Sequence, residues 1–166
     1  MKRIPAILLV ILILLLPIHA DEVSYYDVPF DDTLQDELFQ LCDEYGEYFG
    51  CEIDPKMILA VIQIESSYTA DIVSHGNYGL CQINKVNHKW LSEELGITDF
   101  LDPIQNMRAG VFLYGSYLSV TDGDIHKSAM MYQYGETGAK RRFDIGIYES
   151  VYSRKLVEVM DTLKLK

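Results

Sequence analysis

Glu65 is the residue of this sequence that is best placed for acid–base chemistry. It directly follows a largely apolar run, Met57–Ile64, which predicts a helix buried on most sides. Burial and the negative end of the helix dipole both disfavour the charged carboxylate, and no Lys or Arg lies between Met57 and His75 to offset them. The predicted result is a raised pKa, which keeps Glu65 protonated near neutral pH as a general acid requires. Taken alone, however, the helix pattern favours a simpler interpretation, a helix-end Glu whose carboxylate reaches solvent.

Glu65 opens a series of four motifs that spans about seventy residues. Single members of the series are weak, because Glu-Ser is common and Asp-Pro only marks a helix start, but four in order are specific. The series comprises Glu65-Ser66-Ser67-Tyr68 with Ser74 nine residues after the Glu, Tyr78-Gly79-Leu80-Cys81-Gln82-Ile83-Asn84, Asp102-Pro103-x-x-Asn106-x-x-Ala109-Gly110, and Ala129-x-x-Tyr132-Gln133-x-Gly135.

In this order and spacing the motifs resemble those of the lytic transglycosylase family, whose members have a lysozyme-like fold. Within the family the chain is most similar to small secreted members, often carried by conjugation or secretion systems, so such an apparatus is a candidate partner. The resemblance covers roughly Leu34 to Val159, nearly the whole chain after its first residues.

The resemblance implies a reaction on peptidoglycan glycan strands. Glu65 would protonate the oxygen of the β-1,4 bond between N-acetylmuramic acid and N-acetylglucosamine. Once ionised, it would take the proton from the sugar's own 6-hydroxyl as that oxygen closes on C1, which leaves a 1,6-anhydro end. One carboxylate then suffices, where ordinary glycosidases need two, and no cofactor or metal is required.

The resemblance also implies sugar-binding residues. Ser74 and Gln82 would hydrogen-bond the sugars or orient an acetamido group, and Tyr132 would contact the Glu or the sugar. Tyr148 and Tyr152 resemble tyrosines near the family's last helix, and of the two Tyr148 is the further candidate for the cleft. Without the motifs, Ser74 is better interpreted as a solvated loop hydroxyl, Gln82 as a turn residue and Tyr132 as a core tyrosine.

Two positions depart from the family pattern. Gln133, a predicted substrate-binding residue, stands where the family usually has Asn, so its amide is one methylene longer. Cys81 stands where Met is usual, which keeps an apolar position but places a thiol close to the catalytic loop.

The closest alternative is a hydrolytic muramidase that uses Glu65, a second carboxylate and water. Asp71, Asp99 and Asp102 are candidates for the second carboxylate, although Asp71 fits an exposed loop and Asp102 fits a helix cap. A non-catalytic module for wall binding or assembly is a further alternative, and it would have no need of the intact Glu65.

A Cys/His hydrolase acting on the peptide part of the wall is the rival from another enzyme class. It would pair Cys81 with His75, His88 or His126. Such a nucleophile needs a base within hydrogen-bond reach and often a helix N-terminus, and the sequence shows neither. No His, Asp or Glu pair has metal-ligand spacing.

The first twenty residues are typical of a secretory signal. Lys2 and Arg3 precede an apolar stretch, and the small residue Ala20 follows it. An uncleaved membrane anchor over residues 4–18 is the alternative that we favour less, because the apolar run is short. We therefore expect a signal over residues 1–20, a lead-in over 21–31 and one lysozyme-like domain over 32–166, located outside the cytoplasm.

The net charge of the mature chain, which is the chain without its predicted signal segment, limits the classes of ligand it can bind. Removing Lys2 and Arg3 from the 14 basic side chains leaves 12 against 25 acidic ones, a net charge of −13. Such a chain is repelled by nucleic acid and by anionic membranes, so its ligands should be neutral and bound by hydrogen bonds and stacking. We expect a monomer.

Helices must position these side chains, and the predicted fold class is all-α. Apolar residues at helical spacing run from Asp32 to about Gly50, and a cap followed by Pro starts two more helices at Asp54-Pro55 and Asp102-Pro103. A small irregular or hairpin segment is expected between Ile72 and Asn84.

The last third of the chain is expected to hold two helices. They run from about Gly123 to Tyr134 and from about Tyr148 to Leu163, with a glycine-punctuated basic stretch, Gly135–Gly146, between them. Elsewhere in the chain, Cys42 and Cys51 lie nine residues apart across a turn, and we slightly favour a disulfide between them over free thiols.

Overall fold

The computed structural model describes residues 24–166, and the predicted signal segment lies outside them. The described chain is mainly helical, as predicted, with a three-stranded antiparallel sheet of two-residue strands. Its elements in order are α1 (Asp32–Phe49), α2 (Pro55–Ser66), β1 (Val73–Ser74), β2 (Asn77–Tyr78), β3 (Ile83–Asn84), a 3-10 turn (Lys85–Asn87), α3 (His88–Leu95), α4 (Pro103–Val120), α5 (Ile125–Phe143) and α6 (Val151–Thr162).

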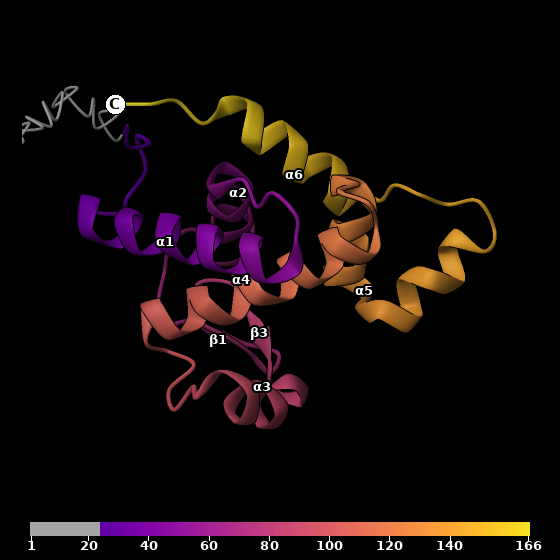
Figure 1. The fold of residues 1–166 in the computed structure, drawn as a ribbon, viewed down its shortest axis with the longest axis horizontal. Helices are drawn as coiled ribbons and strands as arrows, with labels where there is room; N and C mark the ends of the chain where they lie inside the picture. The colour runs from indigo at the N-terminus through magenta and orange to yellow at the C-terminus, as the bar shows by residue number, and fades with distance from the viewer. Residues whose placement is uncertain (1–23) are drawn as a thin grey trace, which may run out of the picture.

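The first helices begin where the capping residues predict. Asp31, Asp54 and Asp102 each accept a hydrogen bond from a backbone N–H of the first turn, and Pro55 and Pro103 occupy the first helical positions. Helix α2 is buried at six consecutive positions from Met57 to Ile62, because it lies between α1 and α6 in the centre of the domain (Figure 1). The core therefore fixes the helix that carries Glu65.

The predicted hairpin segment is present beside this core. Strand β2 lies between β1 and β3, with Val73 opposite Tyr78 and Asn77 opposite Asn84. Together with α3, the sheet forms a lobe on one side of α4 (Figure 1).

Two helical segments were not predicted. Helix α3 has no side-chain cap and buries only Leu91, so it gives little periodic signal. Helix α5 continues to Phe143 beyond a break at Gly135, whose φ of 69° and ψ of 160° are not helical. The predicted end near Tyr134 is therefore a kink, and part of the basic stretch is helical.

Hydrogen bonds hold the two ends of the described chain side by side. Tyr26 forms a β-bridge with Leu165, and the side chain of Gln35 in α1 both accepts from the Tyr26 N–H at 2.8 Å and donates to the Tyr26 carbonyl at 3.0 Å. The lead-in is thus anchored on α1 beside the C-terminus.

All three cysteines have free thiols, so the favoured Cys42–Cys51 disulfide is wrong for this structure. Cys42 is buried on the core face of α1. The thiol of Cys51 is instead directed toward α4, where its sulfur lies 3.6 Å from the carbonyl oxygen of Gly115. Proximity along the chain did not bring the two sulfurs together.

None of the helices in residues 24–166 is both long and apolar enough to span a bilayer.

Candidate active site

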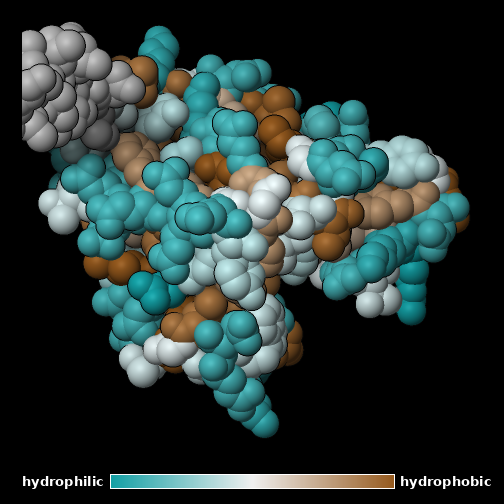
Figure 2. Space-filling model, in the orientation of Figure 1, coloured by the Kyte–Doolittle hydropathy of each residue, from teal (hydrophilic) through white to brown (hydrophobic). Residues whose placement is uncertain are grey.

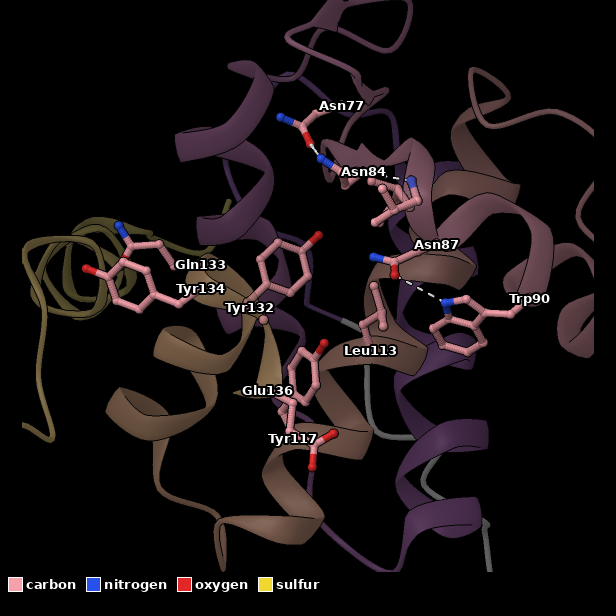
Figure 3. Close-up of a pocket in the computed structure, with 13 residues that line it drawn as sticks. Asn77, Asn84, Asn87, Trp90, Leu113, Tyr117, Tyr132, Gln133, Tyr134 and Glu136 are labelled. Atoms are coloured by element: carbon pink, nitrogen blue, oxygen red, sulfur yellow. Dashed lines mark hydrogen bonds between the residues drawn. The ribbon is translucent and has the colours of Figure 1, made fainter. Parts of the chain in front are cut away.

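A cleft of about 600 Å³ lies between the lobe of α3 and the helix α5, with α4 as its floor. Figure 2 shows the surface hollowed between this lobe and the second half of α5. Figure 3 shows the side chains that line it. Its lining is polar and aromatic with one charged side chain, and consists of Asn77, Ile83, Asn84, Val86, Asn87, Trp90, Leu113, Tyr117, Tyr132, Gln133, Tyr134, Gly135 and Glu136.

The kink in α5 explains how one helix supplies so much of this wall. A regular helix turns successive side chains away from a given surface, so that only every third or fourth residue faces it. Because the backbone is not helical at Gly135, five consecutive residues from Tyr132 to Glu136 line the cleft. The positive φ of 69° is one that glycine adopts without strain.

Glu65 lies near the end of α2, partly buried among tyrosines. It is not itself one of the residues that line the cleft, but its charge acts on the lining residue Tyr132. The hydroxyl of Tyr152 in α6 donates to Oε1 of Glu65 at 2.7 Å. Burial raises the pKa of Glu65 above its ordinary value, and the hydrogen bond from Tyr152 opposes that rise in pKa. The predicted direction of the pKa shift is therefore present, with burial as its main cause.

Tyr132 connects Glu65 to the cleft. Its ring lines the cleft, and its hydroxyl donates to the carbonyl oxygen of Cys81 at 2.5 Å. It stacks on the buried Tyr114 of α4 with 4.5 Å between ring centroids. Burial, followed by the charges of Cys81 and Glu65, raises the pKa of Tyr132 well above its ordinary value, so its hydroxyl stays protonated and can act as a donor.

The loop that carries Cys81 is held by Asn106 of α4. The buried Asn106 amide accepts from the Cys81 N–H at 2.7 Å and donates to the carbonyls of Tyr78 and Phe100 at 2.8 and 2.7 Å. Gly79 passes directly against this amide, with a φ of 73°, and a Cβ there would collide with the Asn106 side chain. The motif residues Asn106 and Gly79 therefore have structural roles, because together they hold the backbone of this loop.

Ser74 lies in β1 and Gln82 in the turn before β3, and neither of them lines the cleft. The hydroxyl of Ser74 contacts His75 Nδ1 at 2.9 Å. Gln82 has a φ of 48°, and its amide nitrogen donates to the carbonyl of Gly79 at 2.9 Å. In this arrangement Gln82 braces the turn that its own strained backbone creates.

Gln133 and Tyr148, the other two predicted substrate-binding residues, lie in different surface hollows. Gln133 lines the cleft, and its Oε1 accepts from the hydroxyl of Ser150 at 2.9 Å. Tyr148 lies in a different surface hollow, stacked on Phe143 with 6.1 Å between centroids. The tyrosine of this segment that reaches Glu65 is Tyr152.

Groups of three or more His, Cys, Asp or Glu side chains that could hold a metal ion are absent from residues 24–166.

The structure resembles a much longer solved protein. It superimposes on an inactive mutant of the lytic transglycosylase Slt from Pseudomonas aeruginosa with a TM-score of 0.57 and 18% sequence identity. The match covers 76% of this chain and 20% of that one, so the present chain spans about a fifth of that protein's length. At this identity the likeness establishes a shared fold.

A family model gives the assignment. The model described as the transglycosylase SLT domain matches residues 50–145, which include Glu65, the hairpin loop, α4 and the kink of α5. This match covers more than half of the sequence and every wall of the cleft. The chain therefore belongs to the transglycosylase SLT domain family.

Proposed function

We propose that this protein is a peptidoglycan lytic transglycosylase in which Glu65 acts first as acid and then as base. The observation that carries the proposal is a partly buried carboxyl with a raised pKa, within an SLT domain, whose charge reaches Tyr132 in the lining of a nearly uncharged cleft. Neutral amide and aromatic side chains suit N-acetylated sugars, which offer hydrogen-bonding groups and apolar ring faces without charge.

The surroundings of Glu65 support a mechanism with a single carboxylate. Burial and the Tyr152 hydroxyl are the two influences that shift its pKa. The candidates for a second carboxylate that the sequence offered are engaged elsewhere or exposed: Asp102 caps α4, Asp99 accepts from the Leu101 N–H, and Asp71 is exposed. The carboxylate that does line the cleft, Glu136, forms an ion pair with Lys140. A hydrolytic muramidase needs a second carboxylate close enough to act as nucleophile or to activate water.

In the proposed reaction, protonated Glu65 gives its proton to the glycosidic oxygen as the bond to C1 breaks. The carboxylate that results accepts a hydrogen bond from Tyr152, which stabilises its charge. The ionised Glu65 then removes the proton from the sugar's 6-hydroxyl as that oxygen bonds to C1. The proton balance closes with Glu65 protonated again, and no water is consumed.

The Cys/His alternative receives no support from the described residues. Cys81 is fully buried, and burial, together with the charges of Glu65 and Cys42, raises the pKa of its thiol, which disfavours the thiolate. The candidate bases are engaged with other groups: His75 with Ser74, His88 with the Ile83 carbonyl and His126 with Ser153.

Replacing Tyr152 by Phe is expected to shift the alkaline limb of the pH–rate profile to higher pH. The Tyr152 hydrogen bond lowers the pKa of Glu65, so its loss lets burial raise that pKa further. The acid then stays protonated to a higher pH. The measurement is kcat/KM for glycan cleavage against pH. The control is Tyr148→Phe, which removes a hydroxyl far from the carboxylate. A shift in the control of the same size would contradict the assignment of Tyr152.

Product analysis tests the proposed reaction. Purified peptidoglycan is digested with residues 21–166, and the released fragments are identified by mass spectrometry. Anhydro-muramyl ends are the expected result. Hydrated reducing ends would indicate a muramidase, cut peptide stems would indicate a peptide hydrolase, and no release would indicate a binding module.

The same proposal includes export and context. Residues 1–20 would direct the chain out of the cytoplasm, where the domain from residue 32 onward acts as a monomer. Tyr132 and Gln133 of the cleft lining would contribute to sugar binding. A conjugation or secretion apparatus is the partner we propose, on the basis of the resemblance to small secreted family members.

A further inference from the structure

Trp90 is a large aromatic side chain in the cleft that the proposed chemistry does not use. It lies on α3, across the cleft from Gln133 and Tyr134 (Figure 3). Although its neighbour Leu91 is fully buried, 40% of Trp90 is exposed. A single exposed aromatic residue is common on protein surfaces. Whether Trp90 binds a ligand therefore has to be judged from the residues around it.

The indole of Trp90 is held in one orientation. Its Nε1 donates to Oδ1 of Asn87 at 3.2 Å. Its ring packs against Phe112 of α4, with 6.2 Å between centroids and 55° between planes. Phe112 is nearly buried, and it packs in turn on Tyr45 and Phe49 of α1 at 5.4 and 5.1 Å. The ring is thus backed by buried aromatic side chains, and such preorganisation reduces the entropy lost on binding a ligand.

The amide side chains beside Trp90 present mainly hydrogen-bond donors. The side-chain oxygens of Asn77, Asn84 and Asn87 already accept from Asn84 Nδ2, the Val86 N–H and the indole, respectively. The amide nitrogens of Asn77 and Asn87, and the second hydrogen on Asn84 Nδ2, are therefore the groups that can donate to acceptors of a ligand. A hexose with an acetamido group offers such acceptors around its edge and an apolar C–H face to a ring.

We propose that Trp90 is a stacking platform that binds one N-acetylated sugar ring on the α3 wall of the cleft, and that Asn87 is its positioning residue. The inference rests on the proposed function, since it assigns a binding position to the same glycan. The platform lies on the opposite wall from Gln133, and a strand in the cleft would pass between them. Stacking stabilises the bound substrate and the transition state equally, so its loss raises KM more than it lowers kcat.

Trp90 is the single tryptophan of the sequence, so tryptophan fluorescence reports on the platform directly. The Glu65→Gln variant is titrated with soluble glycan strands that have been freed of peptide stems. A saturable change in emission intensity or wavelength is expected. The absence of any change, whether or not calorimetry detects binding of the strands, overturns the platform.

Kinetics on the same strands provide the second test. Trp90→Ala is expected to raise KM about tenfold with kcat changed less than about twofold, while Trp90→Phe, which keeps a stacking face, stays within about threefold of wild type. The matched control is Tyr48→Ala. It removes a residue that is 66% exposed and lies outside the cleft, and whose ring centroid is 6.2 Å from that of Phe112. Equal effects of Trp90→Ala and Tyr48→Ala would show a structural role for the aromatic cluster and would contradict the platform.

The outcomes separate this inference from the proposed function. Anhydro ends formed by Trp90→Ala with an unchanged KM overturn the platform alone. A fluorescence change on strand binding by a wild-type protein that makes no anhydro ends supports the platform and overturns the proposed chemistry. Denaturation midpoints of all variants identify any that are misfolded. The fluorescence titration, which leaves Trp90 in place, keeps the test decisive if Trp90→Ala is one of them.

Discussion

Replacing Glu65 by Gln is expected to lower the rate of glycan cleavage by about a thousandfold or more, with the fold intact. One proton donor and acceptor serves both steps of the proposed reaction, and general acid–base catalysis contributes about 10²–10⁴ in rate. Gln keeps the shape and can still accept the hydrogen bond of Tyr152. The measurement is the release of soluble fragments from purified peptidoglycan, and substantial residual activity would remove Glu65 from its role.

The same variant is expected to be more stable than wild type at neutral pH. Burial raises the pKa of Glu65 above its ordinary value of 4.5, so the folded state keeps a proton that the unfolded state has already lost. The free energy of unfolding of the wild type therefore falls as the pH rises from that value through the raised pKa. Gln does not titrate, so the advantage of the variant should disappear in acid. Urea denaturation at several pH values measures it.

Two carboxylates provide matched controls for Glu65→Gln. Asp71 and Asp99 are exposed candidates for a second catalytic carboxylate, and Asp71→Asn and Asp99→Asn make the same chemical change. Both variants should retain wild-type rates of cleavage. A loss of activity in either of them comparable to that of Glu65→Gln would favour the muramidase.

Replacing Asn106 by Ala is expected to destabilise the protein by about 3–5 kcal/mol, because leaving a buried polar group without a partner costs about 1–3 kcal/mol. The substitution removes the partner of the Cys81 N–H and of the carbonyls of Tyr78 and Phe100 at once. It should also reduce cleavage, because the Cys81 carbonyl that positions Tyr132 belongs to the loop that Asn106 holds. Chemical denaturation and cleavage assays measure the two effects.

The neighbouring Gln105 is the control for Asn106→Ala. Its amide oxygen also accepts from backbone groups, the N–H groups of Thr98 and Asp99, but these are exposed, in the segment between α3 and α4. Gln105→Ala should therefore cost only about 1 kcal/mol. A loss of stability as large as that of Asn106→Ala would mean that burial of the amide is not the cause.

The sequence predicted the elements that begin with strong local signals. Asp54-Pro55 and Asp102-Pro103 each combine a side-chain acceptor with a residue that needs no N–H partner, and both helices start there. Helix α3 has no such cap and only one buried residue, so its start could not be predicted from local chemistry. Since Trp90 lies on this helix, nothing in the sequence indicated that it lines the cleft.

The choice between two tyrosines shows how a small error in a helix boundary changes a site. The last helix was expected from about Tyr148, but a reciprocal pair of hydrogen bonds between Ser150 and Ser153 starts it at Val151. Tyr148 therefore precedes the helix, while Tyr152 lies in its first turn and reaches Glu65. The contact joins residues 87 positions apart, and it depends on the packing of α6 against α2. No local pattern encodes that distance.

In the proposed reaction Glu65 directs an intramolecular attack by the sugar's own hydroxyl and not an attack by water. Digestion of peptidoglycan in water enriched in heavy oxygen tests it most directly, because hydrolysis places an oxygen from water on C1 of each new muramyl end. Intramolecular attack yields new ends that carry no heavy oxygen and lack the mass of one water molecule, which is the expected result. New ends that carry the label from the earliest time points would contradict it.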